Sequence, residues 1–355
     1  MDMLKNELYM EDLEYISSLD LPWEKLEGAG ILISGSTGMI GSFLIDALMY
    51  RNMKKDMGLK IYAAGRSAAR AEEKFSPWFK SEGFEFISWD IKEPYMGEVP
   101  GKVDYVLHLA SPTHPLAYSS DPIGTIRANV MGTYNMLEFA MEHRSRRALF
   151  ASSNEIYGEN RGDTEKFDES YCGYIDCNTL RAGYPESKRC AEALCQAYIK
   201  QKGMDIVIPR LTRTYGPTLA HDDTKALSQF IKKAVKREDI VLKSEGKQYY
   251  SYLYAADTVS GLLTVLLKGK KGEAYNVADS ASDIRLKDLS QTAAEIAGTK
   301  VVFELPEASE KAGYSTATKA RLNSEKLKRL GWRARYDIDS GLERTVKILK
   351  SCGYR

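Results

Sequence analysis

The sequence predicts a doubly wound α/β fold, in which helices cover both faces of a parallel sheet. Two observations lead to this fold class: short apolar runs alternate with longer helical patterns, and a glycine-rich turn follows the first run. Buried strands that are separated by crossover helices pair in parallel. The expected strands are Ile31–Ser34, Ile61–Ala64, Phe84–Trp89, Val103–Leu109, Ala148–Ala151 and Ile206–Ile208. The expected helices between them are Ile40–Arg51, Ile123–Glu142 and Tyr184–Gln201.

The two ends of the chain have a different texture. Residues 4–18 are amphipathic and predict a helix, which a connector over Leu21–Gly28 joins to the first strand. Beyond Pro209 the sequence predicts loops at residues 215–217 and 245–247. Further helices are expected at Thr224–Lys236, Thr258–Leu267, Leu286–Ala297 and Asp339–Leu349, and a further strand is expected at Glu273–Val277. We expect this part to close over a substrate.

Composition excludes several classes of function. The chain has 355 residues, with 50 Lys and Arg against 49 Asp and Glu, so its net charge of +1 recruits neither nucleic acid nor an anionic membrane. We expect no signal peptide and no membrane span. An odd number of cysteines, five, favours reduced thiols in the cytoplasm. Their spacing and the scattered histidines favour no metal site.

A glycine turn follows the first strand directly. Gly35, Gly38 and Gly41 have the spacing G-x-x-G-x-x-G between a strand and a helix start. Glycines let the backbone approach a pyrophosphate there, and the helix start offers N–H donors to it. This context predicts a dinucleotide site.

The next two strand ends bear on the choice of dinucleotide. An enzyme that prefers NAD usually carries an acid after the second strand, whereas this chain has Gly65 followed by Arg66 and Ser67, which would suit the 2′-phosphate of NADP. The alternative is that Arg66 is a solvated loop residue. Asp90 after the third strand is placed to meet adenine, although an acid there is also a common cap.

Two further segments point toward the same site. Small residues in Ala110-Ser111-Pro112-Thr113 would let the backbone pass close to a nicotinamide ribose. Asn129 is unfavourable inside a helix by propensity, which favours a buried hydrogen-bonding role over a solvated one. All positions expected to line a cofactor are Gly35, Thr37, Gly38, Met39, Ile40, Gly41, Arg66, Ser67, Asp90, Ile91, Leu109, Ala110, Ser111, Asn129, Ser152, Tyr184, Lys188 and Leu211.

The candidate catalytic residues are Ser153, Glu155, Tyr184 and Lys188. Tyr184 and Lys188 stand at i and i+4 of one helix, so we expect the ammonium to pull the pKa of the phenol down from about 10. Ser153 lies at the end of a strand, where its hydroxyl would contact the substrate oxygen that Tyr184 deprotonates. Glu155 would act as acid or base on the carbon next to the one that bears this oxygen; the alternative is that Glu155 only pairs with a cation.

These motifs resemble the extended short-chain dehydrogenase/reductase family, in particular its nucleotide-sugar epimerases, 4,6-dehydratases and decarboxylases. The pattern is most similar to that of UDP-glucuronate decarboxylases over about residues 29–345, on His108–Pro112, Pro122-Ile123, Gly132-Thr133, Asn135–Leu137 and Arg181–Tyr184. The order of the expected elements predicts a helical extension at residues 1–28 and a Rossmann domain at 29–208. It also predicts a mainly substrate-binding domain at 209–355, of which some segments, at about 250–277, return to the core.

The resemblance further implies a nucleotide sugar as substrate and tightly held NAD or NADP, with a transient C4-keto sugar. A lyase outcome leads because Glu155 is present; 4-epimerisation is the alternative, and a catalytically silent sensor is a remote one. Three positions depart from the decarboxylase pattern: Arg213 replaces an asparagine, Tyr250 replaces an arginine, and Asn154 stands where some dehydratases carry an aspartate. The expected substrate-binding residues are Thr113, Ser153, Asn154, Arg213 and Tyr250.

The two long central helices carry more apolar surface than one sheet face needs. We therefore expect a homodimer in which the helices at Asn129–Glu142 and Tyr184–Gln201 of each chain form a four-helix contact.

Overall fold

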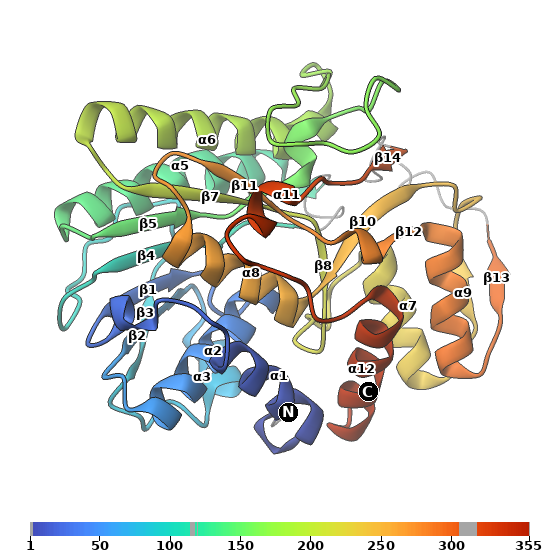
Figure 1. The fold of residues 1–355 in the computed structure, drawn as a ribbon, viewed down its shortest axis with the longest axis horizontal. Helices are drawn as coiled ribbons and strands as arrows, with labels where there is room; N and C mark the ends of the chain where they lie inside the picture. Colours follow the sequence, from blue (N-terminus) through green and yellow to red (C-terminus); the bar gives the residue numbers. More distant parts are fainter. Residues whose placement is uncertain (1–2, 114–117, 119, 305–317, 355) are drawn as a thin grey trace.

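A parallel sheet runs through the molecule with strand order β3-β2-β1-β4-β5-β7-β11 (Figure 1). The computed structural model describes residues 3–113, 118, 120–304 and 318–354. The strands are β1 (Gly30–Ser34), β2 (Lys60–Gly65), β3 (Phe84–Ser88), β4 (Tyr105–His108), β5 (Arg147–Phe150), β7 (Ile206–Leu211) and β11 (Ala274–Val277), with the short β6 (Ser152–Ser153) beside β7. This order confirms the expected doubly wound α/β fold.

Helices cover both faces of this sheet. On one face lie α5 (Pro122–Glu142) and α6 (Gly183–Lys202), and on the other lie α2 (Met39–Lys55) and α8 (Ala255–Lys268) (Figure 1). Every residue of α8 from Ala255 to Leu267 is buried, because this apolar helix packs on the sheet and is flanked by α1 and α2. The short α3 (Ala68–Phe75) covers the β3 edge and was not expected from the sequence.

The second lobe contains more sheet than the sequence analysis expected. β8 (Arg213–Tyr215), β10 (Tyr249–Tyr254), β12 (Asp283–Arg285) and β14 (Lys319–Ala320) form a small sheet, and β9 (Ile240–Leu242) pairs with β13 (Val301–Phe303). Its helices are α7 (Ala226–Lys236), α9 (Leu286–Ala297), α11 (Glu325–Lys328) and α12 (Ile338–Ser351). Of residues 250–277, only α8 and β11 join the main sheet and its layer, since β10 pairs in the small sheet.

The N-terminal extension connects the two lobes. Helix α1 (Glu7–Ser17) packs on α2, α8 and α12 (Figure 1). The Tyr9 hydroxyl donates to Asp46 of α2 at 2.6 Å, and the buried Asp12 accepts from Tyr254 at the end of β10, also at 2.6 Å. The sequence alone assigned this helix no role. Short 3₁₀ turns complete the chain: η1 (Met3–Lys5), η2 (Trp23–Leu26), η3 (Asn154–Tyr157), η4 (Leu180–Ala182) and η5 (Ser280–Ser282).

Candidate active site

The glycine turn closes tightly between β1 and α2. Gly35 has φ 69°, and a Cβ there would lie 2.7 Å from the Ala110 nitrogen, while one on Gly41 would lie 2.3 Å from the Gly35 oxygen. Larger residues are therefore excluded at both positions. Helix α2 begins without a side-chain cap at Gly38, so its first N–H groups are not occupied by a capping side chain. This geometry suits a pyrophosphate at the helix start.

A chain of hydrogen bonds joins the end of β4 to the start of α6. The Ser111 hydroxyl donates to the Asn129 oxygen at 2.7 Å, and the Asn129 amide donates to Ser187 Oγ at 2.9 Å. Ser187 in turn donates to the Tyr184 carbonyl at 2.8 Å. Asn129 is fully buried, so its expected hydrogen-bonding position is confirmed. It fixes the loop at Ser111 relative to the start of α6, which carries Tyr184.

Tyr184 is buried beside Ser153 at the start of α6. Burial raises the pKa of its phenol, while hydrogen bonds with Ser153 and Ser111 and the charge of Arg181 act in the opposite direction. The expected lowering of this pKa was wrong, because burial outweighs the groups that favour the phenolate. The Lys188 ammonium instead donates to the Ala151 carbonyl at 2.9 Å and lies 4.8 Å from the centre of the Phe150 ring.

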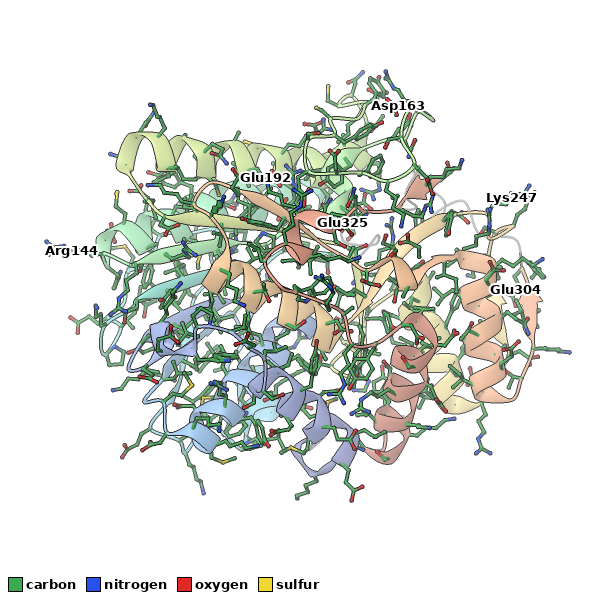
Figure 2. All side chains as sticks on the ribbon, in the orientation of Figure 1. Arg144, Asp163, Glu192, Lys247, Glu304 and Glu325 are labelled. Atoms are coloured by element: carbon green, nitrogen blue, oxygen red, sulfur yellow. The ribbon has the colours of Figure 1, made fainter. Side chains whose placement is uncertain are left out.

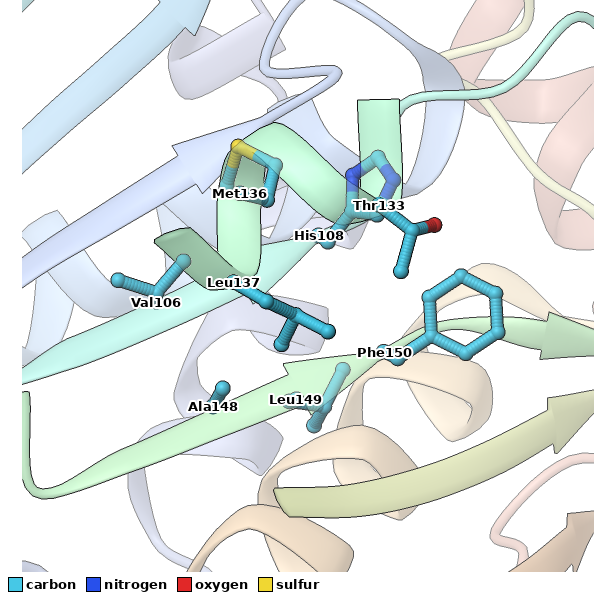
Figure 3. A pocket seen from close by; sticks show the side chains of 8 residues that line it. All are labelled: Val106, His108, Thr133, Met136, Leu137, Ala148, Leu149 and Phe150. Atoms are coloured by element: carbon cyan, nitrogen blue, oxygen red, sulfur yellow. The ribbon is translucent and has the colours of Figure 1, made fainter. Parts of the chain in front are cut away.

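Lys188 and His108 are two buried basic groups beneath the site. Burial lowers the pKa of Lys188 to about 8. Burial and the nearby Lys188 charge lower the pKa of His108 to about 3, so the imidazole is neutral and pairs through Nδ1 with Ser34 Oγ at 2.8 Å. His108 Nε2 has no partner and lines a cavity of about 10 Å³ together with Thr133 and Phe150 (Figure 3). A cavity of this volume is at the lower limit for one water molecule, and most of its lining is apolar.

Glu155 is bound by two arginines from different parts of the chain. Its Oε2 lies 2.6 Å from Arg181 Nη2, and its Oε1 lies 3.4 Å from Arg213 Nη2 on β8. The backbone N–H of Glu155 donates to Ser153 Oγ at 3.2 Å, which caps the 3₁₀ turn η3 and keeps the two residues adjacent. The Arg213 guanidinium lies 3.6 Å from the centre of the Tyr250 ring on β10. Four sequence-predicted residues, Ser153, Glu155, Arg213 and Tyr250, thus meet at one place.

Two residues at this place were not singled out from the sequence. Arg181 stands one turn before Tyr184, a spacing at which its side chain could have been expected near the helix start. The ring of Tyr118 stacks on Tyr184 with centroids 4.7 Å apart, and the Arg181 guanidinium lies 5.1 Å from the Tyr118 ring. Tyr118 had no comparable signal, since its closeness depends on the tertiary path of the chain.

The remaining expected residues lie at strand ends, in the loops after them and at the start of α2. Arg66 and Thr113 are exposed, and Ser67 caps α3 by accepting from the Arg70 N–H. Asp90 pairs with Lys92 at 3.3 Å, and the carbonyl of Ile91 accepts from Asn135 at 2.8 Å. Thr37, Met39, Ile40, Leu109 and Leu211 are half-buried, and Ser152 is buried with an unpartnered hydroxyl.

A larger groove of about 580 Å³ lies away from this site, at the β11 edge of the sheet. Glu192 of α6 and Glu325 of α11 both line it (Figure 2). Arg210 binds Glu192 through two N–H groups, at 3.0 and 2.8 Å, and Lys326 pairs with Glu273. These two ion pairs account for four of the charged residues that line the groove.

Within the described part of the chain, no group of three or more His, Cys, Asp or Glu residues could hold a metal ion. No helix of the described residues is both long and apolar enough to span a bilayer.

Comparison with known proteins places this chain in a family. The model of the NAD dependent epimerase/dehydratase family matches residues 31–278. The chain belongs to this family. UDP-glucuronic acid decarboxylase 3 of Arabidopsis thaliana is 34% identical over 78% of this chain and 77% of its own length.

Two solved structures share the fold. A UDP-glucuronic acid 4-epimerase from Bacillus cereus has a TM-score of 0.76 at 22% identity, covering 91% of this chain and 99% of that one. A dTDP-glucose 4,6-dehydratase from Streptomyces venezuelae has a TM-score of 0.76 at 21% identity, covering 90% and 96%. In this family the glycine turn, the uncapped α2 start and the buried Ser152 hydroxyl are the features of the chain that fit NAD.

Proposed function

We propose that the chain is a nucleotide-sugar lyase that works through a transient C4-keto sugar. The observation that carries this proposal is the position of Glu155, which hydrogen-bonds Ser153 through its N–H and is oriented by Arg181 and Arg213 next to Tyr184. A group in this position suits chemistry at the carbon beside C4. The decarboxylase that is 34% identical over most of both chains supports the same reaction class.

The turn at Gly35–Gly41, Ser152 and Lys188 would hold the dinucleotide, which when bound would accept the hydride from C4 and later return it to the sugar. Tyr184 and Ser153 contact the C4 oxygen in this proposal. Burial favours the protonated phenol, which suits Tyr184 to return a proton to that oxygen, whereas Arg181 and Ser153 favour the phenolate needed to accept one first. The buried Lys188 donates to the Ala151 carbonyl and would bind the ribose of the dinucleotide.

The C4 ketone then activates C5. In a uronic acid, the C5–carboxyl bond breaks, carbon dioxide leaves and C5 takes a proton; in a neutral hexose, C5 loses a proton and water leaves from C6. Glu155 is the residue placed to move or orient the proton at C5 in either case. In the decarboxylation, the hydride then returns to C4 of the sugar ketone. In the dehydration, the hydride adds to C6 of the unsaturated ketone while C5 takes a proton, so neither reaction is a net oxidation.

Replacing Glu155 tests the lyase proposal. Glu155→Gln should slow the step at C5 by about 10²–10⁴-fold while the first hydride transfer persists, so reduced cofactor should accumulate and absorb in the near ultraviolet. Tyr184→Phe should prevent that first transfer, so no reduced cofactor should form. Glu186→Gln is a matched control, because Glu186 lies on α6 in an ion pair with Arg189, at 36% side-chain exposure.

One observation favours a second function. Both oxygens of Glu155 are held by guanidinium groups, as they would be if the carboxylate served only as a counter-ion. A 4-epimerase needs no group at C5, because the ketone only turns over in the site. Near wild-type turnover of Glu155→Gln, with a product of unchanged mass, would establish the epimerase and contradict the lyase.

We also propose that the chain forms a homodimer through α5 and α6. Support comes from the exposed apolar side chains on α5, namely Ile123, Ile126, Met131 and Tyr134, which are between 42% and 73% exposed. We place the enzyme in the cytoplasm, for which the five free cysteines are the support.

A further inference from the structure

The cluster around Glu155 carries one more positive charge than negative charge. Arg181 and Arg213 share this single carboxylate, and the three side chains are between 17% and 21% exposed. Three neutral side chains of the described residues contact the two guanidinium groups: Asn154 contacts Arg213, while the Tyr118 and Tyr250 rings face Arg181 and Arg213. A partly desolvated cation without a matching anion is costly, so a second anion would stabilise the cluster.

Part of the cluster also lacks hydrogen-bond partners. Arg181 Nε and Nη1 are buried without a partner among the described residues, although a guanidinium carries five donors. Arg213 is held in place: it lies over Tyr250, and with the Asn154 amide oriented to satisfy both neighbours its Nη1 donates to the Asn154 oxygen at 2.9 Å. The result is a fixed pair of guanidinium groups with unused donors, which is the geometry that binds carboxylates.

We propose that Arg181 and Arg213 form a binding site for a carboxylate on C5 of the sugar, so that the substrate is a nucleotide uronic acid and Arg213 is its specificity-determining residue. This inference rests on the proposed function. The cation that would bind the carboxylate is Arg213 on β8, a strand that pairs in parallel with β10. The Arg213 guanidinium packs against the aromatic ring of Tyr250 on β10. With the uronate bound, two guanidinium groups would face two carboxylates, which balances the charge.

The position of the cluster separates a sugar carboxylate from the diphosphate of the nucleotide. Tyr118 stacks on Tyr184 and also contacts Arg181, and Glu155 is joined to Ser153, so the guanidinium groups lie close to the residues that contact C4. In a pyranose ring C5 is bonded to C4, whereas C1, which carries the diphosphate, lies across the ring. A charged group on C5 therefore reaches the cluster more directly.

Binding measurements test this site without depending on turnover. All proteins carry Tyr184→Phe to prevent reaction, are saturated with NAD, and are titrated by calorimetry with UDP-glucuronate, UDP-glucose and UDP. With Arg213 intact, UDP-glucuronate should bind about 10- to 100-fold more tightly than UDP-glucose, as expected for charge-assisted hydrogen bonds. Arg213→Asn should remove most of this preference and leave the affinities for UDP-glucose and UDP within about twofold.

Arg321→Asn is the matched control. Arg321 also lies over a tyrosine of β10, Tyr249, and pairs with a glutamate, but strand alternation places Tyr249 and Tyr250 on opposite faces. This variant should keep the preference for UDP-glucuronate. Equal affinity of the parent for UDP-glucuronate and UDP-glucose would overturn the proposal, as would a loss of UDP affinity in Arg213→Asn, since the arginine would then bind the diphosphate. An enzyme with intact Tyr184 that prefers the uronate but releases neither carbon dioxide nor water would contradict the lyase function alone.

Discussion

Asp12 is the residue through which the N-terminal helix holds the second lobe, and its removal should destabilise the protein. It is fully buried and accepts from Tyr254 at 2.6 Å, from Tyr336 at 2.9 Å and from Arg344 Nε at 2.8 Å. Asp12→Ala would leave two phenols without this acceptor, at about 1–3 kcal/mol each. Arg344 would keep its ion pair with Glu11, so no isolated charge would be created.

One effect acts in the opposite direction. Burial raises the pKa of Asp12, which shows that desolvation of its carboxylate already opposes folding, and the substitution removes that cost. The net loss should therefore be about 2–4 kcal/mol. For a chain of 355 residues this corresponds to a fall in Tm of about 3–5 °C, measured by circular dichroism in paired thermal scans.

Glu11→Ala provides the control for this prediction. Glu11 contacts the same arginine, but its side chain is 58% exposed, and exposed ion pairs contribute about 0–1 kcal/mol. Its Tm should stay within about 1 °C of the wild-type value. If Asp12→Ala shifted the Tm no more than Glu11→Ala does, the contacts of Asp12 with the second lobe would not contribute to the free energy of unfolding, and the prediction would be wrong.

Three further predictions concern assembly, cofactor and pH. Light scattering at micromolar concentration should show a dimer that buries on the order of 2,000 Å², and a monomer alone would contradict the α5–α6 interface. Stripped protein should bind NADP at least as tightly as NAD because Arg66 can meet the 2′-phosphate at about 1.5–3 kcal/mol, so an NAD preference that survives Arg66→Ala would refute that role. Burial raises the pKa of Asp257 to about 6 from its ordinary 3.8, so the native state binds the extra proton. The unfolding free energy should then fall as the pH rises from about 4 to about 6, and this fall should be smaller in Asp257→Asn by up to about 3 kcal/mol in thermal scans across that range.

The sequence located the main sheet well because its central strands, such as β1 and β4, are short apolar runs buried on both faces. The expected Ile31–Ser34 differs from β1 by one residue, and Leu286–Ala297 coincides with α9. The strands of the second lobe were missed because they lack this pattern: they are short or polar. In β10 four tyrosines and a serine occupy five of six positions, which gives no clear alternation of apolar and polar residues.

At the candidate site, spacing along the chain predicted only part of the chemistry. Tyr184 and Lys188 are on one helix, as expected, but their i and i+4 relation did not reveal that Lys188 turns to the Ala151 carbonyl. The pairing of Arg181 and Arg213 with Glu155 joins residues 26 and 58 positions apart, so it follows from the packing of η4 and β8 around η3. Burial, which decides the direction of the Tyr184 pKa, is likewise a property of the fold.

Helix α5 presents two different surfaces to two different processes. Asn129 on its buried side fixes Ser111 and Ser187 around Tyr184, while Ile123 and Met131 on the same helix are exposed where a second chain would dock. Subunit association would therefore restrain α5, the helix whose Asn129 fixes the loop at Ser111 next to Tyr184. By mass action, the specific activity should decline on dilution as the dimer dissociates, and saturating nucleotide sugar should shift that decline to lower protein concentration.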